Sequence, residues 1–349
     1  MRSGRVRTPI PVAAGGIMLG MVAALLGALA SGPALGAADD GAAQAARGSV
    51  ASVVPARGID ESSFQHPAGA RISWRSVARA GYRFAFIKAT EGTYYINPHF
   101  KADAAAAKAA GLLVAAYHFA NPANSGGTAQ ADYALNHGGY HADGRTLRLI
   151  LDIEPDPYLK KFCYGLSPAR MISWITAFTG EAHRRTGLWP VINTQPIWWD
   201  KCTGKTRAFG ADQLWVQDHR PAIRRPVLPS GWTSWAYWQY SITGRVPGVT
   251  GNTDLNTLSP ALLAVASPGD LNSPAGRKVR LQVRSVNMTT GQALRYTATG
   301  LPAGLSINPT TGVITGTLTG PPGTSQVTVT VSAAGAATVT VTFTWHVHS

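Results

Sequence analysis

Leu149-Ile150-Leu151-Asp152-Ile153-Glu154-Pro155 is a run of branched apolar residues that ends in two carboxylates two positions apart. A short apolar run of this kind is typical of a strand that is buried on both faces. Side chains of a strand alternate between its faces, so Asp152 and Glu154 project to the same side. Neighbouring acids at a buried strand end resist joint ionisation, which favours an acid catalyst with a raised pKa. The spacing alone leaves a solvent-facing or cation-binding strand end as the alternative.

The sequence around this run alternates strands with helices from about residue 54 to residue 263. Strands are expected at 53–59, 84–89, 112–119, 147–153, 191–194, 213–217 and 235–240. Helices are expected at 74–80, 98–110, 128–137 and 169–185. Such alternation predicts a parallel α/β sheet, open or closed into a barrel.

Polar side chains lie at or near the C-terminal ends of the predicted strands. They are Asp60, Glu91, His118, Asp152, Glu154 and Gln217. Both barrel enzymes and open α/β sheets place their sites at this end of the strands. We therefore expect the functional site there, with His118 as either a general base or a hydrogen-bonded barrel histidine.

The composition changes from about Ser267, where helical patterning stops and Thr, Val, Gly and Ser dominate. The segments 326–332 and 338–344 alternate Val or Phe with polar residues, and turn-rich connections separate such runs. This pattern predicts a small all-β sandwich at residues 276–349, joined by a linker at 264–275. The sandwich lacks clustered carboxylates or histidines, so we do not expect it to be catalytic.

The N-terminus carries the features of a secretory signal peptide. A basic start with Arg2, Arg5 and Arg7 precedes an apolar stretch at 17–30 and small residues at 34–38. We predict a signal peptide at 1–38, a loose leader at 39–54 and a secreted, extracellular protein. An uncleaved anchor is the alternative for this segment. No later stretch is long and apolar enough to span a bilayer, so no membrane association is expected after cleavage.

The number of cysteines and the net charge indicate the environment in which the exported chain works. Cys163 and Cys202 are its two cysteines, and an oxidising compartment predicts one disulfide between them. The formal net charge of +14 predicts attraction to anionic surfaces, either nucleic acid or an anionic cell wall. No basic–aromatic nucleic-acid motif is present, so nucleic acid is not expected as a partner. A solvated basic surface that aids solubility is the alternative.

Six short motifs occur in the order in which one enzyme family carries them. They are Gly58-Ile59-Asp60, Phe84–Gly92 (FAFIKATEG), Ala116–Phe119 (AYHF), Leu151–Glu154 (LDIE), Trp238–Ser241 (WQYS) and Gly251–Asn256 (GNTDLN). In this order they resemble the family 25 glycoside hydrolases, the Chalaropsis-type lysozymes or N-acetylmuramidases. The resemblance covers residues 57–263, and we assign the domain to 55–263.

The resemblance implies an irregular TIM-like β/α barrel that cleaves the β-1,4 bond between N-acetylmuramic acid and N-acetylglucosamine in peptidoglycan. It implies Glu154 as the general acid, with Asp60 and Asp152 as its acidic partners. It implies no metal or organic cofactor. The region around Cys163 and Cys202 is similar to the disulfide of a bacterial and fungal subgroup of this family. We expect a monomer.

Further residues are expected to contact the substrate at this end of the barrel. They are Tyr117, Asp254, Gln239, Trp238, Asn193 and Glu91. Other aromatic residues are candidates for stacking on sugar rings, with burial in the core as the alternative. They are Tyr94, Tyr95, Trp198 and Trp199.

The chain departs from the family's usual pattern at three positions. Glu61 and Phe64 stand where the family usually has Val and Trp, and Asn193 stands where it commonly has Tyr. Glu61 should point away from Asp60, because neighbouring side chains of a strand alternate. Asn193 predicts an altered rate or pH optimum with activity retained.

The sequence thus predicts a secreted lysozyme. Its rivals are a chitinase-like hydrolase of GlcNAc polymers and a catalytically weak wall-binding protein with a lectin-like barrel. Apolar residues before Asp152 disfavour the chitinase, and the presence of all three acids disfavours the lectin. Residues 296–316 resemble the immunoglobulin-like domains of bacterial surface and secreted enzymes, which implies an adhesion, spacer or wall-binding role.

Overall fold

A computed structural model describes residues 56–158, 161–259, 263–287, 293–333 and 338–349 of the 349-residue chain. The predicted signal peptide at 1–38 and leader at 39–54 lie outside these residues. Within the described ranges, no helix has both the length and the apolar composition needed to cross a membrane.

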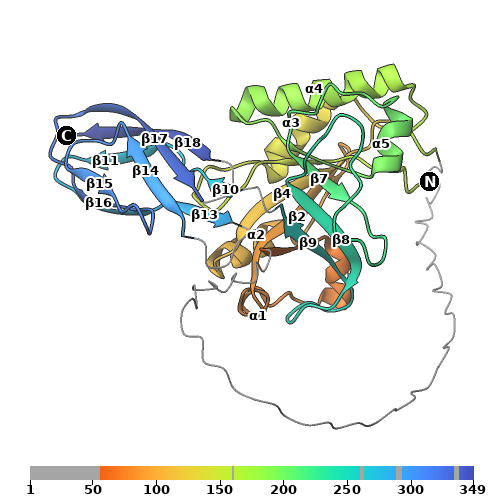
Figure 1. Cartoon of the computed structure of the whole chain (residues 1–349), viewed down its shortest axis with the longest axis horizontal. Coiled ribbons are helices and arrows are strands. Elements are labelled where there is room, and N and C mark those ends of the chain that lie inside the picture. Colours follow the sequence, from red (N-terminus) through yellow and green to blue (C-terminus); the bar gives the residue numbers. More distant parts are fainter. Residues whose placement is uncertain (1–55, 159–160, 260–262, 288–292, 334–337) are drawn as a thin grey trace, which may run out of the picture. The chain divides into compact units, whose positions relative to one another are not determined.

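The first part of the chain forms a closed eight-stranded β barrel, with a ninth short strand at its edge (Figure 1). Its strands are β1 Arg57–Glu61, β2 Tyr82–Glu91, β4 Leu113–Phe119, β5 Ile150–Asp152, β6 Val191–Thr194, β7 Leu214–Gln217, β8 Tyr237–Gly244 and β9 Thr253–Leu258. Strands from β1 to β8 pair in parallel, whereas β9 is antiparallel to both β8 and β1. The additional β1–β2 pairing closes the barrel, and β3 (Tyr95–Ile96) pairs with the end of β2. The predicted irregular β/α barrel is confirmed.

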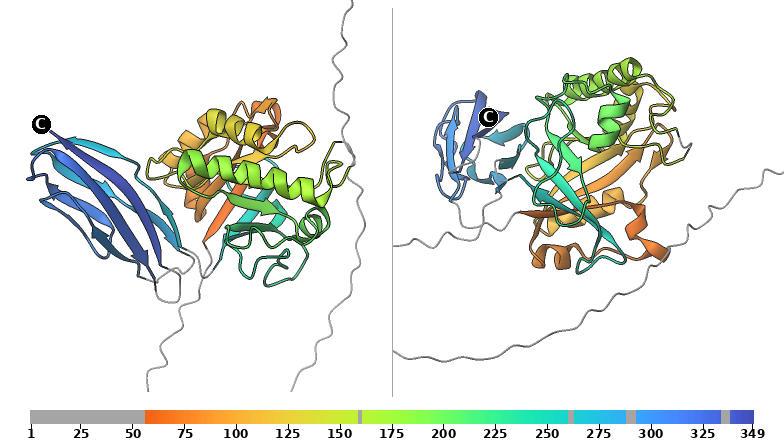
Figure 2. Two further views of the ribbon diagram at one scale, coloured as in Figure 1. Left: turned by 90° about the horizontal axis from the view of Figure 1, so that it is seen from above. Right: turned by 45° about the vertical axis from the view of Figure 1, so that its right-hand side comes forward.

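Helices cover the outside of the barrel in two groups, which the further views also show (Figure 2). They are α1 Trp74–Arg79 and α2 Phe100–Ala109 in one group, and α3 Gly127–Gly138, α4 Pro168–Thr186 and α5 Pro196–Cys202 in the other. Ser167 caps α4 by accepting a hydrogen bond from the backbone N–H of Arg170, and Gly187 ends it at a φ of 72°. These signals were readable in the sequence, because a short polar N-cap and a left-handed glycine mark helix ends.

The barrel interior is filled by aromatic rings below the strand ends. Phe86 packs edge-on against Trp215 and Tyr237, with ring centroids 4.7 Å and 4.9 Å apart. Gly58 lies under Phe84, whose ring would be 2.1 Å from a Cβ at that position. The rings form an apolar floor, so polar side chains that point inward gather at the C-terminal ends of the strands.

Three elements differ from the sequence-based expectation. The strand expected at 147–153 is limited to β5, so Glu154 lies just beyond it. Strand β9 was not expected, because its sequence TDLNTL lacks an apolar run, although it closes the barrel. Helix α5 was also missed, because its paired tryptophans were interpreted as sugar-stacking residues.

The C-terminal region contains a four-stranded and a three-stranded sheet. Their strands are β11 Leu271–Pro274, β14 Arg295–Thr299, β17 Gly323–Ser332 and β18 Val339–His348, and β12 Lys278–Gln282, β15 Leu305–Ile307 and β16 Val313–Thr317. Strands β10 (Leu263–Ala266) and β13 (Arg284–Asn287) form a separate pair. Ile314 of one sheet and Val327 and Trp345 of the other share one core, as the predicted sandwich requires. The expected linker 264–275 contains β11, which pairs in parallel with β18.

Cys163 and Cys202 form a disulfide, as predicted, with Cα atoms 5.3 Å apart. The bond ties the segment after β5 to the end of α5. A crosslink restricts the unfolded chain, and its 39-residue separation is in the range where this effect is worth about 3–4 kcal/mol.

We expect the double substitution Cys163→Ala/Cys202→Ala to lower the free energy of unfolding by about 3–4 kcal/mol. Urea unfolding followed by tryptophan fluorescence measures this, because all tryptophans except Trp345 belong to the barrel region. Reduction of the parent by dithiothreitol should give the same loss. Equal stability of parent and variant would contradict the expectation.

Candidate active site

Four carboxylic acids meet at the C-terminal end of the barrel. Asp60 is the penultimate residue of β1 and pairs with Asp254 of β9, while Asp152 ends β5 and Glu154 lies two residues further on. Burial raises the pKa of Asp254 to about 8, with the nearby Asp60 and Glu154 adding to the rise. The structure therefore brings together all four acids that the sequence singled out.

Two amide side chains hold Asp60. Asn256 Nδ2 donates to its Oδ2 at 2.6 Å, and Gln239 Nε2 donates to the same oxygen at 2.9 Å. Burial raises the pKa of Asp60 to about 6, and these two donors limit the rise. Trp215 Nε1 donates to Asn256 Oδ1 at 2.8 Å, which turns the Asn256 amide nitrogen toward the carboxylate. Asp60 is thus an ionised, oriented group near neutral pH.

A chain of amides supports Glu154. Gln195 Nε2 donates to Glu154 Oε2 at 3.2 Å and to Gln217 Oε1 at 3.0 Å. Gln217 Nε2 donates in turn to Asn193 Oδ1, and Asn193 Nδ2 donates to the Trp215 carbonyl at 2.9 Å. Burial raises the pKa of Glu154, and hydrogen bonds from Gln217 and Gln195 oppose this rise. Sequence reasoning missed Gln195, although its place directly after β6 could have indicated it.

Asp152 is buried at the end of β5. It is 6% exposed, and its Oδ1 has no hydrogen-bond partner among the described residues. Burial raises its pKa well above the ordinary value, and the charges of Glu154 and Asp60 raise it further. Burial and the neighbouring acids therefore favour the protonated form of Asp152, which places less negative charge beside Glu154.

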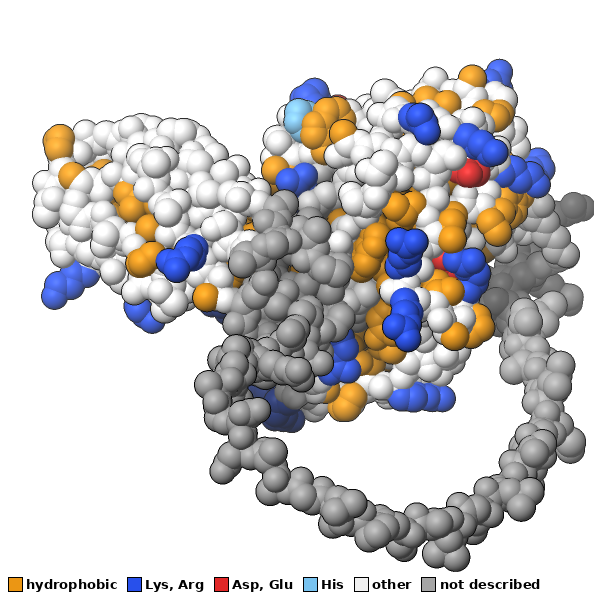
Figure 3. Space-filling model, in the orientation of Figure 1, with side chains coloured by type: hydrophobic (Ala, Val, Ile, Leu, Met, Phe, Trp, Pro, Cys, Tyr) orange, Lys and Arg blue, Asp and Glu red, His pale blue; other side chains and the backbone are white. Residues whose placement is uncertain are grey.

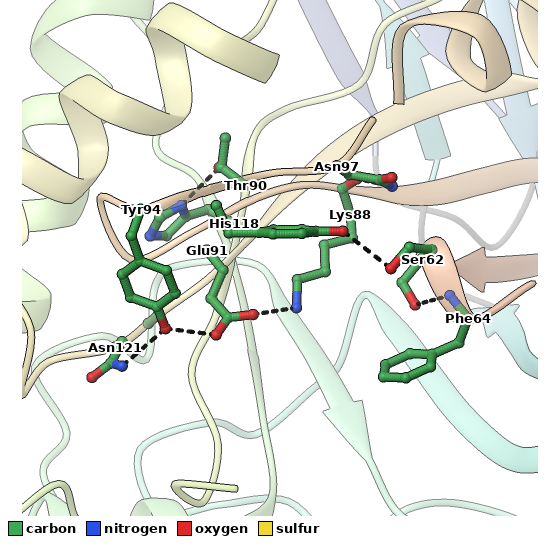
Figure 4. Close-up of polar contacts among 12 residues, drawn as sticks. Ser62, Phe64, Lys88, Thr90, Glu91, Tyr94, Asn97, His118 and Asn121 are labelled. Carbon is green, nitrogen blue, oxygen red and sulfur yellow. Dashed lines mark hydrogen bonds and ion pairs between the residues drawn. The ribbon is translucent and has the colours of Figure 1, made fainter. Parts of the chain in front are cut away.

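Lys88 and Glu91 form a buried ion pair at the end of β2 (Figure 4). Lys88 Nζ lies 2.6 Å from Glu91 Oε2, and the Tyr94 hydroxyl donates to Glu91 Oε1 at 2.6 Å. Asn121 Nδ2 donates to the Tyr94 oxygen at 3.1 Å. Burial alone would raise the pKa of Glu91, but Lys88 and Tyr94 lower it overall. Glu91 is ionised and orients Tyr94, whose ring is half exposed.

The buried aromatic and amide residues take supporting positions. Tyr117 is 7% exposed and meets Trp215 edge-on inside the barrel. Trp238 points to the outer face, where its Nε1 donates to the Asp218 carbonyl at 2.9 Å. Asn193 is fully buried, so its amide serves Gln217 and the backbone. Direct substrate contact by Trp238 and Asn193 stays a prediction, and in this structure both side chains bond to neighbouring protein groups.

Trp198 and Trp199 are fully buried under the outer helices. Their rings are not accessible to a sugar, so both residues belong to the core, which was the alternative to sugar stacking. Tyr94 and Phe64 are instead exposed, at 52% and 85%.

His118 is a hydrogen-bonded barrel histidine. Its Nδ1 lies 2.8 Å from Thr90 Oγ1, and its Nε2 lies 3.0 Å from Gln130 Oε1 of α3. Burial lowers its pKa to about 4, so the ring is neutral and both nitrogens are engaged. The alternative of a general base is disfavoured by this engagement.

Comparisons with known proteins agree with this arrangement. The family described as "Glycosyl hydrolases family 25" matches residues 59–249, and the one described as "Putative Ig domain" matches residues 260–348. Lysozyme M1 of Streptomyces globisporus is 45% identical over 216 residues, covering 60% of this chain and 71% of the relative. N,O-diacetylmuramidase of Chalaropsis sp is 40% identical over 189 residues, covering 53% and 87%. The crystal structure of the bacterial lysozyme from Streptomyces coelicolor is 44% identical with a TM-score of 0.56, covering 59% and 92%.

The raised pKa of Asp254 makes the barrel less stable as the pH rises. Its ordinary pKa of 3.8 describes the unfolded chain, whereas the folded value is about 8. Between these values the folded state retains a proton that the unfolded state has lost, so stability falls with rising pH. We expect Asp254→Asn to raise the melting temperature at pH 8 relative to the parent, with the gain shrinking toward pH 4.

Thermal unfolding across this pH range measures the effect. Asp143→Asn is the matched control with the opposite sign, because hydrogen bonds from Lys108, Arg145 and Thr146 lower the pKa of Asp143 against the effect of burial. The loss of melting temperature caused by Asp143→Asn should be largest at neutral pH. A gain for Asp254→Asn that does not depend on pH would contradict the assignment.

Proposed function

This chain belongs to glycosyl hydrolase family 25, and from this premise we propose that it is a lysozyme acting on bacterial peptidoglycan. The bond cleaved is the β-1,4 linkage between N-acetylmuramic acid and N-acetylglucosamine. The observation that carries the proposal is the pairing of a buried, amide-supported Glu154 with an oriented Asp60 from another strand. Family membership alone does not assign roles to residues. The hydrogen bonds and burial of the individual side chains support the roles proposed for them.

Glu154 is the proposed general acid. A group that protonates a glycosidic oxygen must carry its proton near the working pH, and burial raises the pKa of Glu154 toward that range. Gln195 directs the carboxyl group by donating to Oε2. The raised pKa of Asp152 favours its neutral form, which keeps negative charge low beside the acid.

Asp60 is the proposed ionised partner. Glycoside hydrolysis passes through an oxocarbenium-like state, which a nearby carboxylate stabilises. The two amide donors share Oδ2 of Asp60, and Asp254 also forms a hydrogen bond with the Asp60 carboxyl group. We propose that Oδ1 of Asp60 faces the substrate. This second oxygen can face the reacting carbon or orient the substrate's acetamido group. Asp254 contributes a proton-bearing acid beside it.

Tyr94 and Phe64 are the proposed sugar-stacking residues, because their rings are exposed at the strand ends that carry the acids. Figure 4 shows both at the end of the barrel with the Lys88–Glu91 pair between them. Aromatic faces suit the apolar faces of pyranose rings. Tyr117 underlies the acids as part of the interior packing.

The charge of the molecule suits an anionic cell wall outside the cell. The full sequence carries a net charge of +14, and Figure 3 shows Lys and Arg side chains spread over one face of the barrel. A basic surface is attracted to anionic wall polymers. The predicted signal peptide and the disulfide are consistent with secretion, and the C-terminal sandwich is proposed as a spacer or wall-binding module.

Analysis of the sugar ends tests the function. Purified peptidoglycan is digested, the new ends are reduced with borohydride, and the products are identified by mass spectrometry. Muramitol ends support an N-acetylmuramidase. Glucosaminitol ends would reverse the assigned bond, and activity on chitin alone would favour the chitinase-like alternative. Wall binding without new ends would favour the lectin-like alternative.

We expect Glu154→Gln to reduce the rate of wall lysis by a factor of about 10²–10⁴, because general acid catalysis contributes this much. Sedimentation with insoluble walls should show unchanged binding. Glu181→Gln, on the surface of α4, is the matched control and should lyse walls at the parent rate. Lysis by Glu154→Gln at the parent rate would refute the assignment.

We expect Gln195→Leu to move the alkaline limb of the pH–rate profile to higher pH. Gln195 stabilises the carboxylate form of Glu154 by hydrogen bonding, so its removal raises the pKa of the acid. Initial rates on peptidoglycan between pH 4 and 9 measure the limb. A uniform loss of rate with no movement of the limb would indicate a purely structural role.

A further inference from the structure

A second polar cluster lies on the outer side of β1, behind the catalytic acids. Glu61 directly follows Asp60 and points the opposite way, as strand alternation predicts. His66 Nε2 lies 2.9 Å from Asp103 Oδ2 and 3.6 Å from Glu61 Oε2. The three residues come from the end of β1, the turn after the short helix at Ser63–Gln65, and α2. Their nearest nitrogen and oxygen atoms all lie within 4.8 Å of one another.

The cluster is buried, and the polar atoms that face its centre have no hydrogen-bond partner of good geometry among the described residues. The side chain of Glu61 is 0% exposed, and those of His66 and Asp103 are 4% and 9% exposed. Neither carboxylate oxygen of Glu61 has a hydrogen-bond partner among the described residues, nor do His66 Nε2 and Asp103 Oδ2. Burying charged groups without such bonds is costly unless they are paired or coordinate a metal.

Surrounding groups orient two members of the cluster for coordination. His66 Nδ1 lies 2.9 Å from the Ala70 carbonyl oxygen, to which it donates, so Nε2 faces the carboxylates. The polar contact with Glu61 raises the pKa of His66 to about 9, so a metal ion that binds at Nε2 displaces a proton from it. Trp74 Nε1 donates to Asp103 Oδ1 at 2.9 Å, which leaves Oδ2 facing His66. The ring of His99 stacks on His66 at 3.8 Å. Metal-ligating histidines are held by this kind of backbone hydrogen bond at the second nitrogen.

We propose that Glu61, His66 and Asp103 bind one Zn²⁺ ion, with water completing the coordination. One imidazole and two carboxylates suit zinc, whereas Ca²⁺ and Mg²⁺ prefer oxygen ligands alone. Ligands about 2.0–2.1 Å from a tetrahedral zinc ion lie about 3.4 Å apart, which falls between the 2.9 Å from His66 Nε2 to Asp103 Oδ2 and the 3.6 Å from His66 Nε2 to Glu61 Oε2. The two carboxylates also balance the charge of the ion.

The proposed ion has a structural role. It joins the end of β1, which carries Asp60, to α2 across the outer core. The site does not touch the catalytic acids and does not depend on the proposed lysozyme activity.

Isothermal titration of the chelator-treated protein with ZnCl₂ tests the proposal. We expect one Zn²⁺ per chain, a higher melting temperature with Zn²⁺, and no corresponding effect of CaCl₂. Glu61→Val should weaken Zn²⁺ binding at least about tenfold and abolish the thermal shift. Glu181→Gln should bind Zn²⁺ like the parent.

Asp103→Asn serves as the second variant, because it preserves the acceptor for Trp74 and should also bind more weakly by at least about tenfold. Absence of Zn²⁺ binding by the folded parent would overturn the proposal. Equal binding by the parent and by both ligand variants would also overturn it, since the ion would then occupy exposed histidines such as His346.

Discussion

The burial of several acids at one end of a closed barrel is the constraint on which the rest of this structure depends. Carboxyl groups that lie close together in a buried site cannot all ionise, so their surroundings determine which of them are charged. Hydrogen-bond donors make this difference here. Asn256 and Gln239 lower the cost of a charge on Asp60, whereas Oδ1 of Asp152 has no such donor among the described residues and burial raises the pKa of Asp152 well above its ordinary value. The amides are therefore as much a part of the site as the acids.

The amides can act in this way because the barrel holds them rigidly from below. Trp215 contributes to both supports: its indole orients Asn256, and its backbone carbonyl receives the amide of Asn193. The same ring packs against Phe86 in the apolar interior. Packing inside the barrel thus determines the orientation of Asp60 and, through Gln217 and Gln195, that of Glu154. A substitution in the barrel interior should therefore alter the orientation of the acids even where the substituted residue does not contact them.

Neighbouring residues of β1 serve opposite sides of the barrel wall. Asp60 faces the interior and the catalytic acids, while Glu61 faces the outer core with His66 and Asp103. An acid on each face of one strand end concentrates unfavourable charge in the barrel wall. On the inner side, the amides stabilise the negative charge by hydrogen bonding. On the outer side, the proposed cation would neutralise it.

The sequence by itself determined the elements whose signals are local. Helix α4 has its cap and terminating glycine within its own sequence, β6 spans the predicted residues, and alternation in the C-terminal region predicted long strands such as β17. Asp60, Asp152 and Glu154 were also identifiable, because they lie at the ends of strands whose carboxyl ends must meet, whereas only the family resemblance indicated Asp254. Only the tertiary structure decided which side chains support them. Gln195 and Asn256 bond to acids far away in the chain, and Trp198 and Trp238 are buried by helices that periodicity cannot place. Strand β9 looked irregular because its inward residues serve the polar layer. Local pattern reports which residues prefer a helix or a strand, whereas the partners of a buried polar group depend on how distant segments pack.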